Sequence, residues 1–119
     1  MKILLFGITN VGKSTVGKLL GVRLNYEFDD LDDVIKNQYK TIDKFKEKYS
    51  NDYERHMQKG KILLDIVNKY EDNVVIAVSP IYYEEFFEDI IKEQNILAIE
   101  LQDAPEEILK RLVFCWWKW

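Results

Sequence analysis

The stretch GITNVGKS, residues 7–14, matches the pattern G-x-x-x-x-G-K-S/T at every fixed position. It follows an apolar run at 3–6, typical of a buried strand, and leads into residues 13–24, whose apolar positions have helical spacing. The two glycines let the backbone curl so that its N–H groups point inward, where they can cradle phosphate oxygens. The sequence therefore predicts a phosphate-binding loop between a strand and a helix. The alternative is an ordinary strand–turn–helix that contains two glycines.

The residue types in this loop suit a nucleotide triphosphate with a magnesium ion. The helix that follows adds the positive end of its dipole. Lys13 can reach the outer phosphates and neutralise charge during transfer, and the Ser14 hydroxyl can ligate magnesium. Thr15 supports the helix start or contacts an inner phosphate. We therefore expect ATP and Mg²⁺ as cofactors, with the nucleotide bound by Gly7, Asn10, Val11, Gly12, Lys13, Ser14 and Thr15.

Short apolar runs alternate with longer amphipathic stretches along the chain. Strands are expected at 3–6, 74–78 and 96–101, with a weaker one at 26–28. Helices are expected at 13–24, 32–39, 42–49, 53–70 and 82–92, and another after Asp103. This alternation predicts an α/β fold, a parallel sheet with helices on both faces. We expect residues 1–119 to form a single domain.

Composition excludes several other classes of protein. The chain has 119 residues, 47% of them hydrophobic and 32% charged, which is typical of a soluble globular domain. A net charge of -4 argues against nucleic-acid binding. The single cysteine, Cys115, excludes an internal disulfide framework and a multi-cysteine zinc site. Apolar runs are too short to span a membrane, and the first residues lack a signal-peptide pattern. We expect a cytoplasmic monomer that acts on a small molecule.

Four carboxylates lie within five residues in DDLDD, at 29–33. One interpretation is a solvated helix cap, because acidic side chains are favoured near a helix N-terminus. The other is chemical, because the stretch follows the weak strand and would lie beside the phosphate-binding loop. There one carboxylate could help to hold magnesium, and another could orient or deprotonate a hydroxyl group that attacks the terminal phosphate.

With these residues taken together, the chain resembles the shikimate kinase family of small P-loop kinases. Residues 7–35 are similar to the phosphate loop, first helix and following segment of that family, and FDDLDDVI at 28–35 is similar to its F-x-D-x-D-E-L-I. The resemblance implies a P-loop NTPase fold of the shikimate and nucleotide kinase type. It also implies that Asp30 helps to position magnesium. Asp32 would hold the acceptor hydroxyl and act as its catalytic base.

Two later segments extend the resemblance. Residues 51–63 are similar to the F-R-x-x-E helix of the family, with Gln58 in place of the glutamate. The match implies that Arg55 grips the carboxylate of the acceptor. Residues 103–112 are similar to a late helix of the family, which implies that Arg111 lies near the nucleotide base.

The scarcity of arginine relative to lysine supports a functional role at two of these positions. The chain has 14 lysines and only three arginines, and both Arg55 and Arg111 fall on motif positions. Arginine offers a planar, two-pronged donor that lysine cannot replace. The alternative for each is an ordinary surface charge. The only histidine, His56, is expected at the surface rather than in catalysis.

The chain departs from the family pattern in two places. SPI at 79–81 stands where the family has three glycines, and proline has no N–H to donate, so the acceptor pocket must differ. The Ser79 hydroxyl could compensate as a substrate-binding group, or it could simply end a strand. The family also continues beyond this length with a further strand and a basic lid, so we expect the domain to be C-terminally incomplete.

The leading hypothesis is a magnesium-dependent ATP phosphotransferase that acts on a hydroxyl group of a small anionic metabolite, with shikimate as the first candidate. The absence of a lid would impair such a kinase, so whether the chain is an active enzyme stays open. A second hypothesis is a non-catalytic nucleotide-binding remnant or regulatory module. A third is a nucleoside or nucleotide kinase, against which the spacing of Asp30, Asp32 and Arg55 argues.

Overall fold

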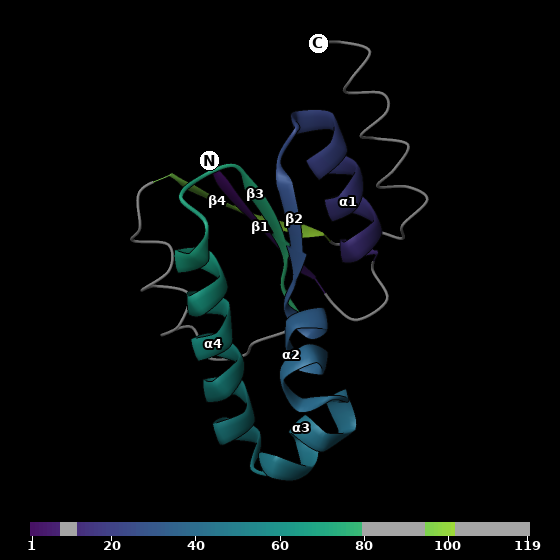
Figure 1. Cartoon of the computed structure of the whole chain (residues 1–119), viewed down its shortest axis with the longest axis vertical. Coiled ribbons are helices and arrows are strands. Elements are labelled where there is room, and N and C mark those ends of the chain that lie inside the picture. The colour runs from purple at the N-terminus through teal and green to yellow at the C-terminus, as the bar shows by residue number, and fades with distance from the viewer. Residues whose placement is uncertain (8–11, 80–94, 102–119) are drawn as a thin grey trace.

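A parallel sheet forms the centre of the computed structural model, which describes residues 1–7, 12–79 and 95–101. The strands are β1 (Lys2–Gly7), β2 (Glu27–Asp30), β3 (Val74–Ala77) and β4 (Ile96–Leu101). They form a four-stranded sheet in the order β2-β3-β1-β4, and every pair of neighbours is parallel. Figure 1 shows the strands side by side between the helices. The predicted α/β fold with a parallel sheet is confirmed.

The helices lie where the sequence predicts them, within one or two residues. They are α1 (Lys13–Leu24), α2 (Leu31–Tyr39), α3 (Ile42–Lys48) and α4 (Asp52–Lys69). Asp30, Thr41 and Asn51 cap the N-termini of α2, α3 and α4 by accepting backbone N–H groups. The helices predicted at 82–92 and after Asp103 lie outside the described residues.

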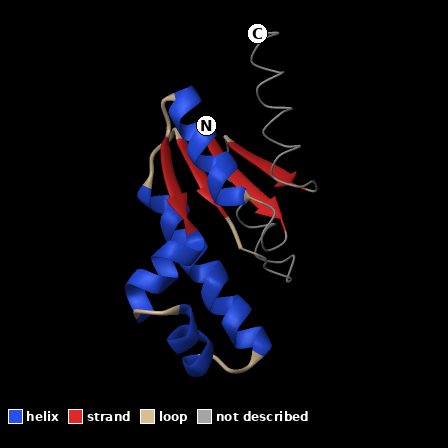
Figure 2. Cartoon of the chain, turned by 90° about the vertical axis from the view of Figure 1, so that its right-hand side faces the viewer, coloured by secondary structure: helices blue, strands red, loops and turns tan. Residues whose placement is uncertain are grey.

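The sheet separates two hydrophobic cores, because successive side chains of a strand point to opposite faces. On one face, Leu4 of β1 packs with residues of α2, α3 and α4, among them Ile35, Phe45 and Leu63. On the other face, Ile3 and Leu5 of β1 pack with residues of β3 and α1. Figure 2 shows α1 in front of the sheet, while the other helices extend toward the bottom of the view. The predicted coverage of both faces is therefore confirmed.

Two glycines bring α1 close to the sheet. A Cβ atom built on Gly17 would lie 2.4 Å from Cε2 of Phe28, and one on Gly21 would lie 3.2 Å from the carbonyl oxygen of Tyr26. Only glycine fits this separation without a shift of the neighbouring groups. The close approach fixes the start of α1 relative to the carboxyl ends of the strands.

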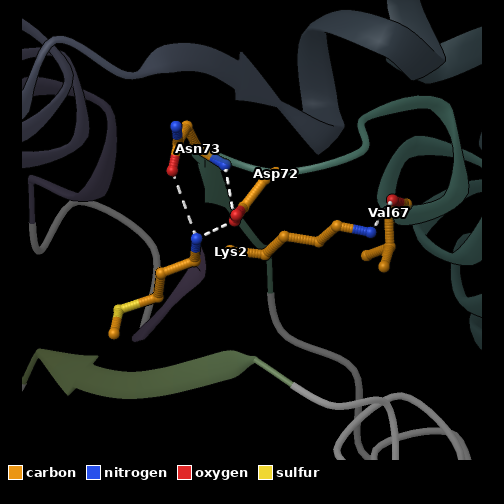
Figure 3. A network of polar contacts seen from close by, with 5 residues as sticks. Lys2, Val67, Asp72 and Asn73 are labelled. Atoms are coloured by element: carbon orange, nitrogen blue, oxygen red, sulfur yellow. Dashed lines mark hydrogen bonds and ion pairs between the residues drawn. The ribbon is translucent and has the colours of Figure 1, made fainter.

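Polar contacts tie the beginning of β1 to the end of α4 and to the segment between α4 and β3 (Figure 3). The N-terminal amine donates to Asn73 Oδ1 at 3.2 Å and forms an ion pair with Asp72. Lys2 Nζ donates to the carbonyl oxygen of Val67 at 2.8 Å. These contacts hold β1 and β3 in register from the end that lies opposite the phosphate loop. No helix in the described part of the chain is both long enough and apolar enough to cross a membrane.

Candidate functional site

The carboxyl ends of β1, β2 and β3 meet at one edge of the sheet. The register pairs Asp30 with Ala77 and Ala77 with Leu5, so β2 ends level with the last residues of β1. Gly7 ends β1, and Ser79 follows β3 by two residues. In open parallel sheets, ligands bind outside the carboxyl ends of the strands. The topology therefore brings Gly7, Asp30 and Ser79 to the edge where a ligand is expected.

Gly12 begins the helical side of the phosphate loop. Its φ of 92° and ψ of 26° lie in the left-handed region, which favours glycine. Its carbonyl oxygen accepts the first helical hydrogen bond from the Val16 N–H at 3.0 Å. No side chain caps α1, and its first turn has no acidic residue. The positive end of the helix dipole therefore favours an anion at this position. Asn10 and Val11 lie outside the described residues.

Lys13 bridges the two ends of the loop. Its Nζ atom donates to the carbonyl oxygen of Gly7 at 2.8 Å, which joins the end of β1 to the start of α1. Burial lowers the pKa of Lys13, while the carboxylates of Asp32 and Asp30 oppose that shift. The lysine therefore lies within the field of both carboxylates that the sequence assigns to chemistry. Thr15, next but one along α1, is exposed.

Asp30 uses its two carboxylate oxygens for two different purposes. Oδ1 accepts the backbone N–H of Asp32 at 2.8 Å and that of Asp33 at 3.3 Å, which caps α2. Oδ2 accepts a hydrogen bond from the Ser14 hydroxyl. The two sequence interpretations of the acidic stretch, a helix cap and a polar site beside the loop, thus meet in one residue.

The Ser14 and Asp30 pair has the chemistry that magnesium requires. Hard oxygen donors from two different elements lie in direct contact, next to the phosphate loop. Within the described residues, no group of three or more His, Cys, Asp or Glu side chains could hold a metal ion. An ion at this pair would therefore complete its shell with phosphate and water oxygens, as Mg²⁺ commonly does.

Asp29 links Asp30 to Tyr70 through two hydrogen bonds, which the sequence patterns did not predict. Asp29 Oδ1 accepts the backbone N–H of Asp30 at 3.0 Å, and its Oδ2 accepts the Tyr70 hydroxyl at 3.1 Å. Burial, followed by the charge of Asp29 and this hydrogen bond, raises the pKa of Tyr70 to about 12. The end of α4 is thereby connected to the carboxyl end of β2.

Arg55 lies in the first turns of α4 and is already paired. Its guanidinium donates to Asp52 Oδ1 at 2.6 Å, and His56 Nε2 lies 3.5 Å from the same oxygen. His56 is only 4% exposed, so its predicted surface position is wrong. The reason is the orientation of α4, which turns His56 inward. Burial is the main cause that lowers the pKa of His56, which favours the neutral imidazole.

Asp32 lies on the first turn of α2, half-buried, where its charge acts on two lysines. Burial lowers the pKa of Lys13 on α1 and that of Lys59 on α4, and in each case the charge of Asp32 opposes this shift. Lys59 was missed by sequence reasoning. The signal that could have found it is a lysine one turn after Arg55, on the apolar side of an amphipathic helix.

The remaining predicted residues are Ser79 and Arg111. Ser79 is 7% exposed at the carboxyl end of β3, and its hydroxyl has no hydrogen-bond partner among the described residues. Pro80, Ile81 and Arg111 lie outside the described residues.

Comparisons with known proteins agree with this geometry. A family model described as shikimate kinase matches residues 9–114. A shikimate kinase of Azobacteroides pseudotrichonymphae is 41% identical over 78 residues, which are 64% of this chain and 44% of that protein. One of Clostridium botulinum (strain Langeland) is 33% identical over 117 residues, 93% of this chain and 64% of that protein.

Solved structures give the same result. A shikimate kinase from Aquifex aeolicus matches with a TM-score of 0.70 and 31% identity, over 91% of this chain and 62% of that one. A shikimate kinase from Acinetobacter baumannii, solved with shikimate, matches with a TM-score of 0.73 and 25% identity, over 92% of this chain and 60% of that one. The chain thus spans less than two thirds of the length of these relatives.

Proposed function

The chain belongs to the shikimate kinase family, and on this premise we propose that it transfers the γ-phosphoryl group of ATP to a hydroxyl group of a small anionic metabolite. Shikimate is the first candidate, because a relative of similar fold was solved in complex with it. The observation that carries the proposal is the contact of Ser14 with Asp30, beside Lys13 and two residues from Asp32.

The transfer needs little covalent work from the protein. The acceptor oxygen forms a bond to the γ-phosphorus, the bond from that phosphorus to the β-bridging oxygen breaks, and ADP leaves with the bonding electrons. The hydroxyl proton passes to the carboxylate of Asp32, the proposed base. Catalysis then consists mainly of positioning and of neutralising the charge that develops on the phosphate oxygens.

Three residues serve the nucleotide and its metal in this proposal. Lys13 exchanges its contact with the Gly7 carbonyl for the outer phosphates, and the N–H groups at the start of α1 face the phosphate chain. Ser14 and Asp30 would hold Mg²⁺, which supplies positive charge to the β- and γ-phosphate oxygens when bound. Arg111 is proposed to lie near the base.

The acceptor is proposed to be held by Asp32, Arg55 and Ser79. Arg55 can keep its bond to Asp52 and still serve an acceptor carboxylate, because a guanidinium has five N–H donors. The buried hydroxyl of Ser79, unpaired among the described residues, is available to an acceptor hydroxyl group.

A coupled assay of ADP release, with and without shikimate, tests the proposal. We expect shikimate-dependent turnover that Lys13→Ala lowers by at least about 10²-fold, the effect of removing one donor to the transition state. Lys18→Ala is the matched control, because Lys18 is exposed on the same helix, and it should retain turnover. Unfolding midpoints of both variants should stay near that of the wild type.

Two results would contradict the proposal. ATP binding by calorimetry without acceptor-dependent release of ADP would indicate a nucleotide-binding module. Turnover with a nucleoside panel but not with shikimate would indicate a nucleoside kinase that shares the phosphate loop alone.

A further inference from the structure

The inner face of α4 contains a lysine among otherwise apolar or buried residues. Lys59 lies three residues after His56 and four before Leu63, both of which are buried. Residues at these spacings share one face of a helix. That face packs toward α2, whose first turn contains Asp32. The helix geometry therefore directs the half-buried Lys59 side chain toward the acceptor end of the site.

Charged groups on three helices act electrostatically on the Lys59 ammonium. Asp32 of α2 and Asp52 of α4 attract it, whereas Arg55 of α4 and Lys46 of α3 repel it. Burial is the largest influence and lowers the pKa of Lys59. Three cations against two carboxylates leave one positive charge uncompensated in this cluster.

Lys59 has no direct counter-ion in the part of the chain that the structure describes. The ion pairs found there involve the N-terminus, Arg55 and His56, and none joins Lys59 to a carboxylate within 4.0 Å. One carboxylate oxygen of Asp52 is already in contact with Arg55 and with His56. A partly desolvated ammonium without a direct partner is costly, and an anion that contacts it recovers that cost.

We propose that Lys59 is a specificity-determining residue that binds the anionic group of the acceptor together with Arg55. This inference rests on the proposed function and deepens it, because it assigns the acceptor carboxylate to two cations one turn apart on α4. Arg55 supplies a guanidinium held in place by Asp52. Lys59 supplies a positive charge that has no carboxylate within 4.0 Å among the described residues. The charge of Asp32, the proposed base, acts on Lys59 across the space between α2 and α4.

A cycle of one variant and two ligands tests this pairing. The probes are shikimate and its methyl ester, which has the same hydroxyl groups but no carboxylate charge. We expect wild-type protein to bind shikimate more tightly than the ester in calorimetry, and Lys59→Met to reduce this preference by about 10- to 100-fold, the effect of one charge-assisted hydrogen bond. The KM for shikimate should rise by a similar factor, with kcat and the KM for ATP little changed.

Two further variants separate charge from structure. Lys61→Met is the control, because Lys61 is exposed and lies on the opposite face of α4, and its preference for shikimate should equal that of the wild type. Lys59→Arg keeps the charge and should keep most of the preference. An unchanged preference in Lys59→Met, with shikimate turnover intact, would overturn the role of Lys59 alone. Failure of the wild type to bind shikimate would overturn the proposed function and this inference with it.

Discussion

Replacing Asp30 by asparagine and by alanine separates the structural use of this residue from its chemical use. Asparagine keeps an oxygen that can accept the N–H groups of Asp32 and Asp33, and its amide can donate to the Ser14 oxygen. It does not keep the negative charge that a magnesium ion prefers. Alanine removes both the cap and the partner of Ser14.

The contacts of Asp30 predict different losses of unfolding free energy for the two variants. Loss of an aspartate cap costs about 1 kcal/mol of unfolding free energy, and loss of the Ser14 hydrogen bond costs about 1 kcal/mol more. Asp30→Ala should therefore lose about 2 kcal/mol, which lowers Tm by about 8 °C for a domain of this size. Asparagine caps helices as well as aspartate does, so Asp30→Asn should lose less than about 1 kcal/mol, the cost of removing a charge near the helix N-terminus.

Urea unfolding followed by circular dichroism measures stability, and the coupled assay measures kcat/KM for ATP with magnesium. We expect both variants to lose at least about tenfold in kcat/KM, since both lack the carboxylate charge. Wild-type turnover in Asp30→Asn would refute the metal assignment. Equal destabilisation by asparagine and alanine would refute the cap as the structural role.

Two further predictions concern packing and pH. Gly17→Ala should destabilise the fold by about 1 kcal/mol, because overpacking against Phe28 costs about 2 kcal/mol and the gain in helix propensity offsets about 1 kcal/mol. Urea unfolding measures this change, and the control Lys18→Ala on the same helix should change the free energy of unfolding by less than about 0.5 kcal/mol. A Gly17→Ala protein that is more stable than the wild type would contradict the close packing. The pKa of Tyr70 is raised from its usual 10.0 to about 12 in the folded protein, so its contribution to stability is complete below pH 10 and is lost as pH rises toward 12. Tyr70→Phe should be less stable near neutral pH and should lack this part of the alkaline decline, and identical pH profiles for the two proteins would contradict the contact with Asp29.

Local patterns predicted the fold because most of the helices and strands are specified by a few consecutive residues. The run at 3–6, the loop at 7–14 and the caps each act over a few residues, and the structure has the corresponding strands and helices. The weak strand was predicted to end at Phe28, but β2 continues through Asp30. Aspartate is unfavourable in strands, and here the pairing of β2 with β3 overrides that preference.

The candidate site was predictable where motif and local geometry coincide and not where distant segments meet. Lys13, Ser14 and Asp30 lie at positions that a motif defines, and the structure brings all three to one edge of the sheet. The contact of Asp29 with Tyr70 spans 41 positions, and no short pattern encodes it. The burial of His56 and the placement of Lys59 depend on how α4 is rotated against α2, which tertiary packing decides.

The two hydrophobic cores have a consequence for how this protein can change over evolution. Lys13 and Ser14, which are proposed to serve ATP, stand on α1 on one side of the sheet, and the acceptor groups of α2 and α4 lie on the other side. Mutations among the core residues of α2 or α4 therefore change a different hydrophobic core from the one that supports α1. Selection can thus change which metabolite accepts the phosphoryl group while ATP remains the proposed donor.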